Sequence, residues 1–283
     1  MDIYSIITER IITSLEKGVV PWRKPWASSI PSNYISGKHY TGINTFLLGL
    51  SNYDNPYWLT FKQINGQGGS IKKGEKASIV TYFTLLDKKQ DESKNDSDKK
   101  NKIPMMKYYN VWNWEQTTGI PEKIPVDRKN NDSILECEKI IDNIKDKPLF
   151  KNGSKAYYSP KEDYISMPSL SRFNSSEDFF STFFHELTHA TGHPKRLNRE
   201  GLKNIAFGSE CYSKEELIAE MGASFLSGIT GISQKVIDNS ASYIQSWLRV
   251  LKNDKKIVIS AATQAQKAVN FILGKRDCEN DNL

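Results

Sequence analysis

Apolar residues recur at helical spacing in several separate segments of the chain. In the first segment they stand four residues apart, and Gly18 just beyond it is a typical helix C-cap. Most of the intervening positions are polar, so one face of each helix is expected to be buried. The segments predicted as helices are residues 3–17, 134–144, 214–227, 236–252 and 259–273.

Two other stretches, residues 78–86 and 105–112, are dense in Val, Ile, Tyr, Phe and Trp, which is typical of strands. We expect them to pair as a hairpin. Residues 87–102 between them are charged and contain no apolar residue, so they predict a mobile loop. Shorter strand patterns occupy residues 156–159 and 164–167, directly before a further helical segment.

The polar, proline-containing stretch 121–131 separates these two kinds of pattern and is the predicted domain boundary. The sequence thus predicts an α+β protein of two domains. Residues 1–125 would form a β-rich module, and residues 126–283 a mainly helical one. A length of 283 residues is compatible with two small domains.

Charge and aromatic residues are concentrated in the first half. The net charge is +6, and residues 1–125 hold 17 basic against 12 acidic side chains, five of the six tryptophans and eight of the thirteen tyrosines. Such a composition is typical of a surface that pairs phosphates with Lys and Arg and stacks bases on aromatic rings. The alternative is that these rings belong to the core.

The segment 21–26, Pro-Trp-Arg-Lys-Pro-Trp, combines two indoles and two cations with prolines that disfavour regular structure. We therefore expect it to be exposed and to bind single-stranded DNA, although the prolines could equally pack the indoles against the sheet. The DNA-binding candidates are Trp22, Arg23, Lys24, Trp26, Lys72 and Lys73.

Several classes of protein are disfavoured. No stretch approaches the roughly 20 apolar residues of a membrane span, and the N-terminus begins acidic where a signal peptide would be basic. The three cysteines are far apart, without the CxxC spacing of a thiolate zinc site. We expect a cytoplasmic protein with free thiols and no membrane partner.

The segment 185–189, His-Glu-Leu-Thr-His, carries the clearest chemistry in the chain. It follows a helix start of the capping-box type at residues 175–178. On a helix, His185 and His189 present two imidazoles to one zinc ion, and Glu186 beside them is the candidate general base of a peptidase. A chance match is disfavoured, because three of the four histidines fall within nine residues.

The third ligand decides the subclass. Lys195 stands where a metzincin would have its next histidine. Residues 213–220 instead resemble the E-x-x-A-D helix of gluzincin-type peptidases, which implies Glu216 as the ligand and Glu220 as support for a histidine. As an alternative, Glu216 could form a capping box with Ser213, leaving Glu220 as the ligand. His193 could be a fourth contact, but it stands just past Gly192, where the helix should end, so we prefer a place for it beside the site or at the surface.

The two halves together resemble the ArdC-type antirestriction proteins of conjugative plasmids and mobile elements, over nearly the whole chain. The matching stretches are residues 21–26, 40–44, 58–63, 68–76 and 109–113 in the first half, and residues 184–189, 196–199, 215–220 and 243–248 in the second. The resemblance implies a single-stranded-DNA-binding domain and a zincin-like metallopeptidase domain, which help incoming DNA to escape restriction.

The hypothesis is therefore an antirestriction protein that binds single-stranded DNA and carries a zinc peptidase site with a possible protein substrate. One alternative is a zinc protease that acts on DNA-bound proteins, as SprT-like enzymes do, but those usually have a third histidine. Another is a DNA-binding protein with a structural zinc, which would need no base such as Glu186.

Overall fold

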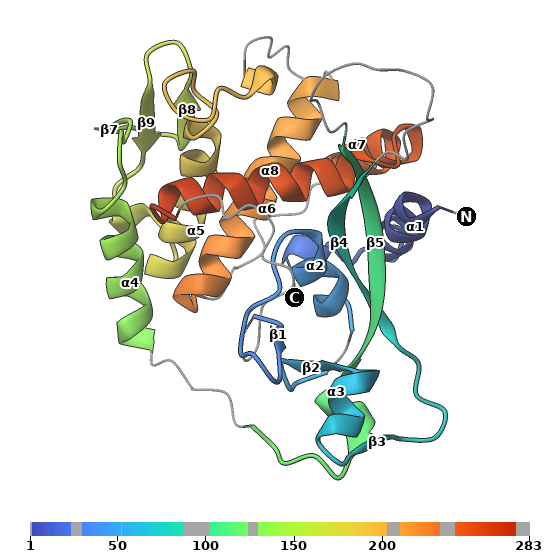
Figure 1. Cartoon of the computed structure of the whole chain (residues 1–283). Helices are drawn as coiled ribbons and strands as arrows, with labels where there is room; N and C mark the ends of the chain where they lie inside the picture. The colour runs from blue at the N-terminus through green and yellow to red at the C-terminus, as the bar shows by residue number, and fades with distance from the viewer. Residues whose placement is uncertain are drawn as a thin grey trace.

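The structure, a computed structural model, describes residues 2–23, 30–51, 53–87, 102–123, 130–202, 210–232 and 241–275. Sheets in the first half and long helices in the second give the mixed architecture of Figure 1, so the predicted α+β class is confirmed. The charged loop predicted between the hairpin strands lies almost wholly outside the described residues, as do Lys24 and Trp26.

The first half of the chain builds a small sheet surrounded by short helices. Its elements are α1 (Ile3–Glu16), η1 (Pro21–Arg23), β1 (Ser32–Asn33), α2 (Ile43–Gly49), β2 (Tyr57–Thr60), α3 (Phe61–Gly66), β3 (Ser70–Ile71), β4 (Ser78–Asp87), β5 (Lys102–Asn113), η2 (Trp114–Gln116) and β6 (Thr117–Thr118). The main sheet has the order β1-β2-β5-β4, in which β1 runs parallel to β2 and the other pairs are antiparallel. β3 and β6 form a separate pair.

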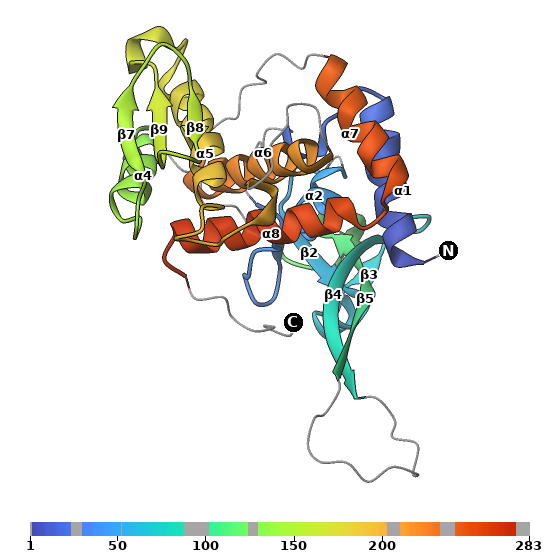
Figure 2. The ribbon, with the colours of Figure 1, turned by 90° about the horizontal axis from the view of Figure 1, so that it is seen from above.

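β4 and β5 form a long hairpin, which confirms the pairing predicted from their composition. Ser78 lies opposite Val111 at one end. Near this end Val80 and Val111 are buried against Trp58. Because side chains alternate between the faces of a strand, Tyr82 and Tyr109 lie farther out on the same face. Figure 2 shows the hairpin extending away from the helices.

The second half is mainly helical. Its elements are α4 (Asn130–Asp142), β7 (Leu149–Asn152), β8 (Tyr157–Ser159), β9 (Tyr164–Met167), η3 (Leu170–Arg172), α5 (Ser176–Ala190), η4 (Glu200–Leu202), α6 (Glu210–Thr230), α7 (Ala241–Asn253) and α8 (Ile257–Ile272). The two short strands predicted before α5 are β8 and β9, which pair antiparallel, with β7 parallel on the other side of β9. None of the helices in the described ranges combines the length and apolarity that a membrane span requires.

The crossing of α5 and α6 is very close. α5 begins as predicted, with Ser175 accepting a hydrogen bond from the backbone N–H of Asp178. Farther along it meets α6 at Gly222, where an added Cβ would lie 2.5 Å from Cγ2 of Thr188. The Thr188 hydroxyl cannot easily give way, since it donates to the Phe184 carbonyl and is fully buried. A side chain at position 222 would therefore push the two helices apart.

Gly222→Ala is expected to destabilise the protein by about 1–3 kcal/mol, the usual cost of overpacking a dense core. The measurement is the free energy of unfolding by denaturant titration. Gly66→Ala is the matched control, because a Cβ at Gly66 would meet no atom within 4 Å. Equal stability of Gly222→Ala and wild type would contradict the close packing described.

The two halves share one hydrophobic core. The indole of Trp22 lies edge-on to Phe46 at 6.3 Å and to Trp247 of α7 at 5.2 Å. Phe46 in turn stacks on Phe225 of α6 at 4.8 Å. Trp22 is 0% exposed, so the expected exposure of its indole is wrong and the alternative of a packed indole applies, while a part of Trp22 in DNA binding stays a prediction. Pro21 starts a short 3₁₀ turn, although prolines were expected to disfavour regular structure here, and the Trp22 indole within this turn packs inward. The boundary predicted near residue 125 stays a prediction.

Candidate metal centre

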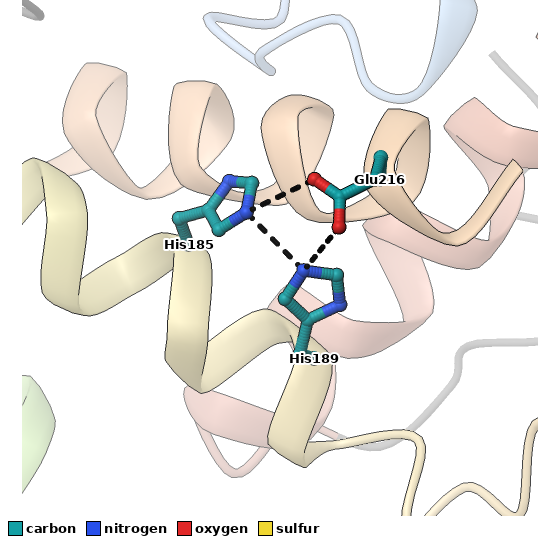
Figure 3. Close-up of side chains that lie close together, drawn as sticks. All are labelled: His185, His189 and Glu216. Carbon is teal, nitrogen blue, oxygen red and sulfur yellow. Dashed lines mark hydrogen bonds and ion pairs between the residues drawn. The ribbon is translucent and has the colours of Figure 1, made fainter. Parts of the chain in front are cut away.

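His185 and His189 stand one turn apart on α5 and point toward α6 (Figure 3). Their Nε2 atoms are 3.2 Å from each other. Glu216 of α6 places Oε2 3.6 Å from His185 Nε2 and Oε1 3.5 Å from His189 Nε2. Side chains of two helices, far apart in sequence, thus direct their donor atoms at one point.

This group has the composition and spacing of a metal site. Within the described part of the chain, one ligand atom from each of His185, His189 and Glu216 lies within 4.8 Å of the others. Two ligands roughly 2 Å from a tetrahedral ion stand about 3.3 Å apart, which is close to the separations found here. Imidazole nitrogens and carboxylate oxygens are ligands that zinc and similar divalent ions take. The donor set therefore fits a divalent metal ion.

The outward-facing Nδ1 atoms of both histidines lie near further carboxylates of α6. His185 Nδ1 lies 3.9 Å from Glu220 Oε1, and His189 Nδ1 lies 3.4 Å from Glu215 Oε1. The position of Glu220 beside a histidine is the one expected from the sequence. Glu215 was not anticipated. Each imidazole is thus placed between the common point and an outer carboxylate.

The predicted capping box at the start of α6 is wrong. The helix begins at Glu210, so Ser213 lies inside it and is no N-cap. The Ser213 hydroxyl lies 2.9 Å from the Ser246 hydroxyl of α7 instead. Interior backbone N–H groups bond to carbonyls one turn earlier, which leaves the Glu216 carboxylate free to face the histidines. The alternative in which Glu216 caps its own helix is thereby removed.

Glu186 and His193 belong to the same stretch of chain as His185 and His189 but have different surroundings. Glu186 is half-buried on α5, next to His185. His193 lies past the end of α5, with Nδ1 3.8 Å from Asp163 Oδ2 and accepting a hydrogen bond from the backbone N–H of Lys195. His193 is therefore directed at a different carboxylate from the ones that surround His185 and His189.

Two family models match the chain. Residues 1–112 match the N-terminal domain of anti-restriction factor ArdC, and residues 136–264 match a zincin-like metallopeptidase. The chain is also similar to the metal-free crystal structure of the antirestriction protein ArdC from plasmid R388, with a TM-score of 0.78 and 34% identity, covering 96% of this chain and 97% of that one. The chain belongs to the ArdC antirestriction family.

Further relatives of the chain differ in length. The Mn(II)-bound structure of the R388 protein aligns with a TM-score of 0.77 and 35% identity, over 97% of this chain and 98% of that one. A DNA primase, TraC, of Escherichia coli is 31% identical over 292 residues, which are 94% of this chain but 26% of the primase. An uncharacterized protein of Sinorhizobium fredii is 27% identical, over 96% of this chain and 91% of that one. The chain thus spans about a quarter of the primase.

Burial and neighbouring charge set the protonation of the candidate metal centre. Burial lowers the pKa of His189, but hydrogen bonds and charge from Glu215 and Glu216 outweigh it and raise this pKa to about 10. Burial also lowers the pKa of His185, but Glu216, Glu186 and Glu220 together outweigh it, so this pKa is raised. Conversely, the two histidines hold the pKa of the Glu216 carboxyl well below its usual range although burial opposes them. A metal ion must therefore displace protons from the histidines.

Sequence reasoning missed one buried charge at the centre besides Glu215. Arg199 donates to both oxygens of Glu215, through Nε at 3.1 Å and through Nη2 at 2.5 Å. The stretch 196–199 belongs to the family resemblance, and that was the available signal. α6 begins more than ten residues after Arg199, and no sequence period relates the two. The contact between Arg199 and Glu215 was therefore not predictable from local patterns.

The remaining DNA-binding candidates are Lys72, Lys73, Arg23, Lys24 and Trp26. Lys72 is exposed, and its Nζ donates to the Glu115 carbonyl oxygen at 2.6 Å. Lys73 is also exposed, next to Gly74, which has the positive φ of a turn. The side chain of Arg23, like Lys24 and Trp26, is outside the described part of the chain. These candidates stay predictions.

Proposed function

We propose that the chain is a zinc-dependent peptidase in which His185, His189 and Glu216 hold the ion. The convergence of these three side chains from α5 and α6, with Glu186 beside them, is the observation that carries the proposal. When bound, zinc lowers the pKa of a water molecule and polarises a substrate carbonyl. A bare structural site would usually be closed by four protein ligands, whereas three leave room for substrate.

Each of the surrounding residues has a distinct role in this proposal. Glu186 takes a proton from the attacking water and passes it to the leaving amine, so that one carboxylate serves both halves of the reaction. Glu215 accepts a hydrogen bond from the Nδ1–H group of His189, and the Glu220 carboxylate attracts the Nδ1–H group of His185 from 3.9 Å, which favours in both rings the tautomer whose Nε2 is the ligand. Burial of the centre strengthens these interactions, because little water screens them.

The activity test is hydrolysis of an unfolded protein, casein, by the full chain, with and without a chelator. Chelator-sensitive cleavage would support the peptidase. Adding single-stranded DNA and a DNA-bound protein to the same assay distinguishes the alternative of a protease that acts on proteins on DNA. No cleavage under any condition by zinc-loaded protein would favour a structural zinc in a DNA-binding protein.

We propose further that the chain binds single-stranded DNA in the cytoplasm and protects incoming mobile-element DNA from restriction. Membership of the ArdC antirestriction family and the match of residues 1–112 to the ArdC N-terminal domain support this role. The basic and aromatic excess of the first half supplies the chemistry, since cations pair with phosphates and rings stack on unpaired bases.

With Trp22 buried, the better candidate for the DNA contact is the outer part of the β4–β5 hairpin, beyond the buried Val80 and Val111. Tyr82 and Tyr109 stack on each other with centroids 4.5 Å apart and planes 5° from parallel, and Tyr109 is 41% exposed. Lys107 lies directly opposite Tyr82 in the register, on the same face. This arrangement provides a flat ring surface beside a cation, which suits a base and its phosphate.

Replacing both Tyr82 and Tyr109 by alanine should weaken single-strand binding by about 5- to 150-fold per engaged base, because stacking is worth roughly 1–3 kcal/mol. The measurement is titration of the full chain against a labelled oligonucleotide, since Trp22 and Trp247 share a core that a fragment would expose. Tyr157→Ala is the matched control, an exposed tyrosine on β8 in the other half. Unchanged affinity in the double variant would move the DNA contact elsewhere.

A further inference from the structure

Arg199 is a buried cation tied to the last turn of α5. Only 7% of its surface is exposed. Its guanidinium donates to Thr191 Oγ1 at 2.6 Å and to the carbonyl oxygens of Thr188 and His189 at 2.7 and 3.4 Å. The carbonyls at a helix C-terminus carry partial negative charge and lack partners within the helix, so a cation here stabilises the turn that carries His189.

The same guanidinium holds a carboxylate of the opposite helix. Glu215 of α6 is 2% exposed and accepts hydrogen bonds from Nε and Nη2 of Arg199. Such a two-point contact fixes both the position and the plane of a carboxylate. Glu215 Oε1 then lies 3.4 Å from His189 Nδ1, on the side of the ring that faces away from Glu216.

Two glycines in the backbone around Arg199 and Glu215 leave space for their side chains. A Cβ at Gly192 would lie 2.9 Å from the guanidinium carbon of Arg199 and 2.2 Å from Leu202 Cδ1. A Cβ at Gly201 would lie 3.3 Å from Glu215 Oε2. Two glycines therefore leave the space in which Arg199 and Glu215 meet. A buried charge that loses its partner is costly, so neither member is expected to tolerate removal of the other.

We infer that Arg199 and Glu215 are positioning residues for the metal centre: Arg199 fixes the Glu215 carboxylate, and Glu215 accepts the Nδ1–H of His189 so that Nε2 is presented to the ion. The inference rests on the proposed metal site and adds to it the means by which α5 and α6 are held in register around the ion. Outer partners of this kind orient a ligand imidazole and increase its basicity.

The test is the zinc affinity of the full chain, measured by competition with a chromophoric chelator. Glu215→Gln keeps the size of the side chain but removes its charge, and Arg199→Lys keeps the charge but removes the two-point contact. Each is expected to weaken zinc binding by about 10- to 100-fold, the usual effect of losing an outer partner. Combining them should weaken binding little further than Glu215→Gln alone, because Arg199 acts through Glu215.

Arg196→Lys is the matched control. Arg196 lies in the same connection after α5 and makes a comparable ion pair with Asp163, with a further hydrogen bond to Tyr158 at 3.2 Å. That pair faces His193 and not the proposed ligands. The control variant should lose stability in a thermal melt of the metal-free protein and still bind zinc as tightly as wild type.

Two outcomes would overturn the inference. Wild-type zinc affinity in Glu215→Gln would show that the carboxylate does not position His189. Equal losses of affinity in Arg199→Lys and Arg196→Lys would show a general effect of stability. If the wild-type chain itself bound no zinc, the proposed metal site would fail and this inference with it, so the two failures are distinguishable. Conversely, a loss of zinc affinity confined to the Arg199 and Glu215 variants would support the positioning role.

Discussion

Glu186→Gln is expected to slow peptide hydrolysis by roughly 10²–10⁴-fold, the range that loss of a positioned general base produces. Glutamine has nearly the same shape as glutamate, so α5 and its packing should be preserved. It cannot accept the proton of an attacking water, however. Because Glu186 is adjacent to His185 but is not one of the three converging side chains, the variant should still bind about one zinc per chain.

The measurement for Glu186→Gln combines the rate of casein cleavage with the zinc content of the purified protein. Glu177→Gln provides the control, since it makes the same substitution in the first turn of α5, far along the helix from the centre. It should cleave at the wild-type rate. A Glu186→Gln protein that keeps both its zinc and its activity would remove Glu186 from the mechanism.

Replacing both His185 and His189 by alanine should reduce the zinc content from about one ion per chain to almost none. Only Glu216 of the three converging side chains would remain, and a single carboxylate does not retain a zinc ion against dilution. His193→Ala tests the same histidine-rich segment, yet it should leave the zinc content unchanged, because His193 faces Asp163. Metal analysis after dialysis measures all three proteins, and zinc retained by the double variant would contradict the assigned ligands.

The same metal site predicts a definite dependence on pH. In the metal-free protein the pKa of His189 is raised to about 10, so its ring holds a proton at neutral pH. Zinc must displace that proton. Affinity should therefore increase with pH through the neutral range, by about tenfold per pH unit for each proton displaced, and should fall on acidification. A titration at several pH values measures this slope, and a flat profile would argue against histidine ligation.

Local sequence patterns identified the long elements and the histidine pair for a simple physical reason. α5 combines a serine N-cap with apolar residues on one face, and two histidines four residues apart need only one helix to meet. The short elements were not predictable in this way, because strands of two residues such as β1 and β3 contain no period. The early start of α6 was hidden by a capping signature at Ser213 that tertiary packing overrides.

Local patterns failed at residues whose surroundings depend on packing against parts of the chain distant in sequence. The chemistry around Trp22 suggested exposure, but its burial depends on Trp247, more than 200 residues later. Glu215 was visible in the sequence as a neighbour of the proposed ligand. Its role became apparent only when the fold brought Arg199 to one side of it and His189 to the other. Residues that function through a partner distant in sequence leave no local pattern.

The aromatic side chains of the two halves pack on one another, and this limits how recombination can exchange the halves between related proteins. The residues concerned are Trp22, Phe46, Phe225 and Trp247. A crossover between the two halves would pair one lineage's Trp22 with another lineage's α6 and α7, and mismatched rings would leave cavities or clashes in a dense core. Inheritance as one block avoids this. The TraC primase is consistent with such inheritance. Its match spans 94% of this chain, so it includes both halves together within a much longer protein.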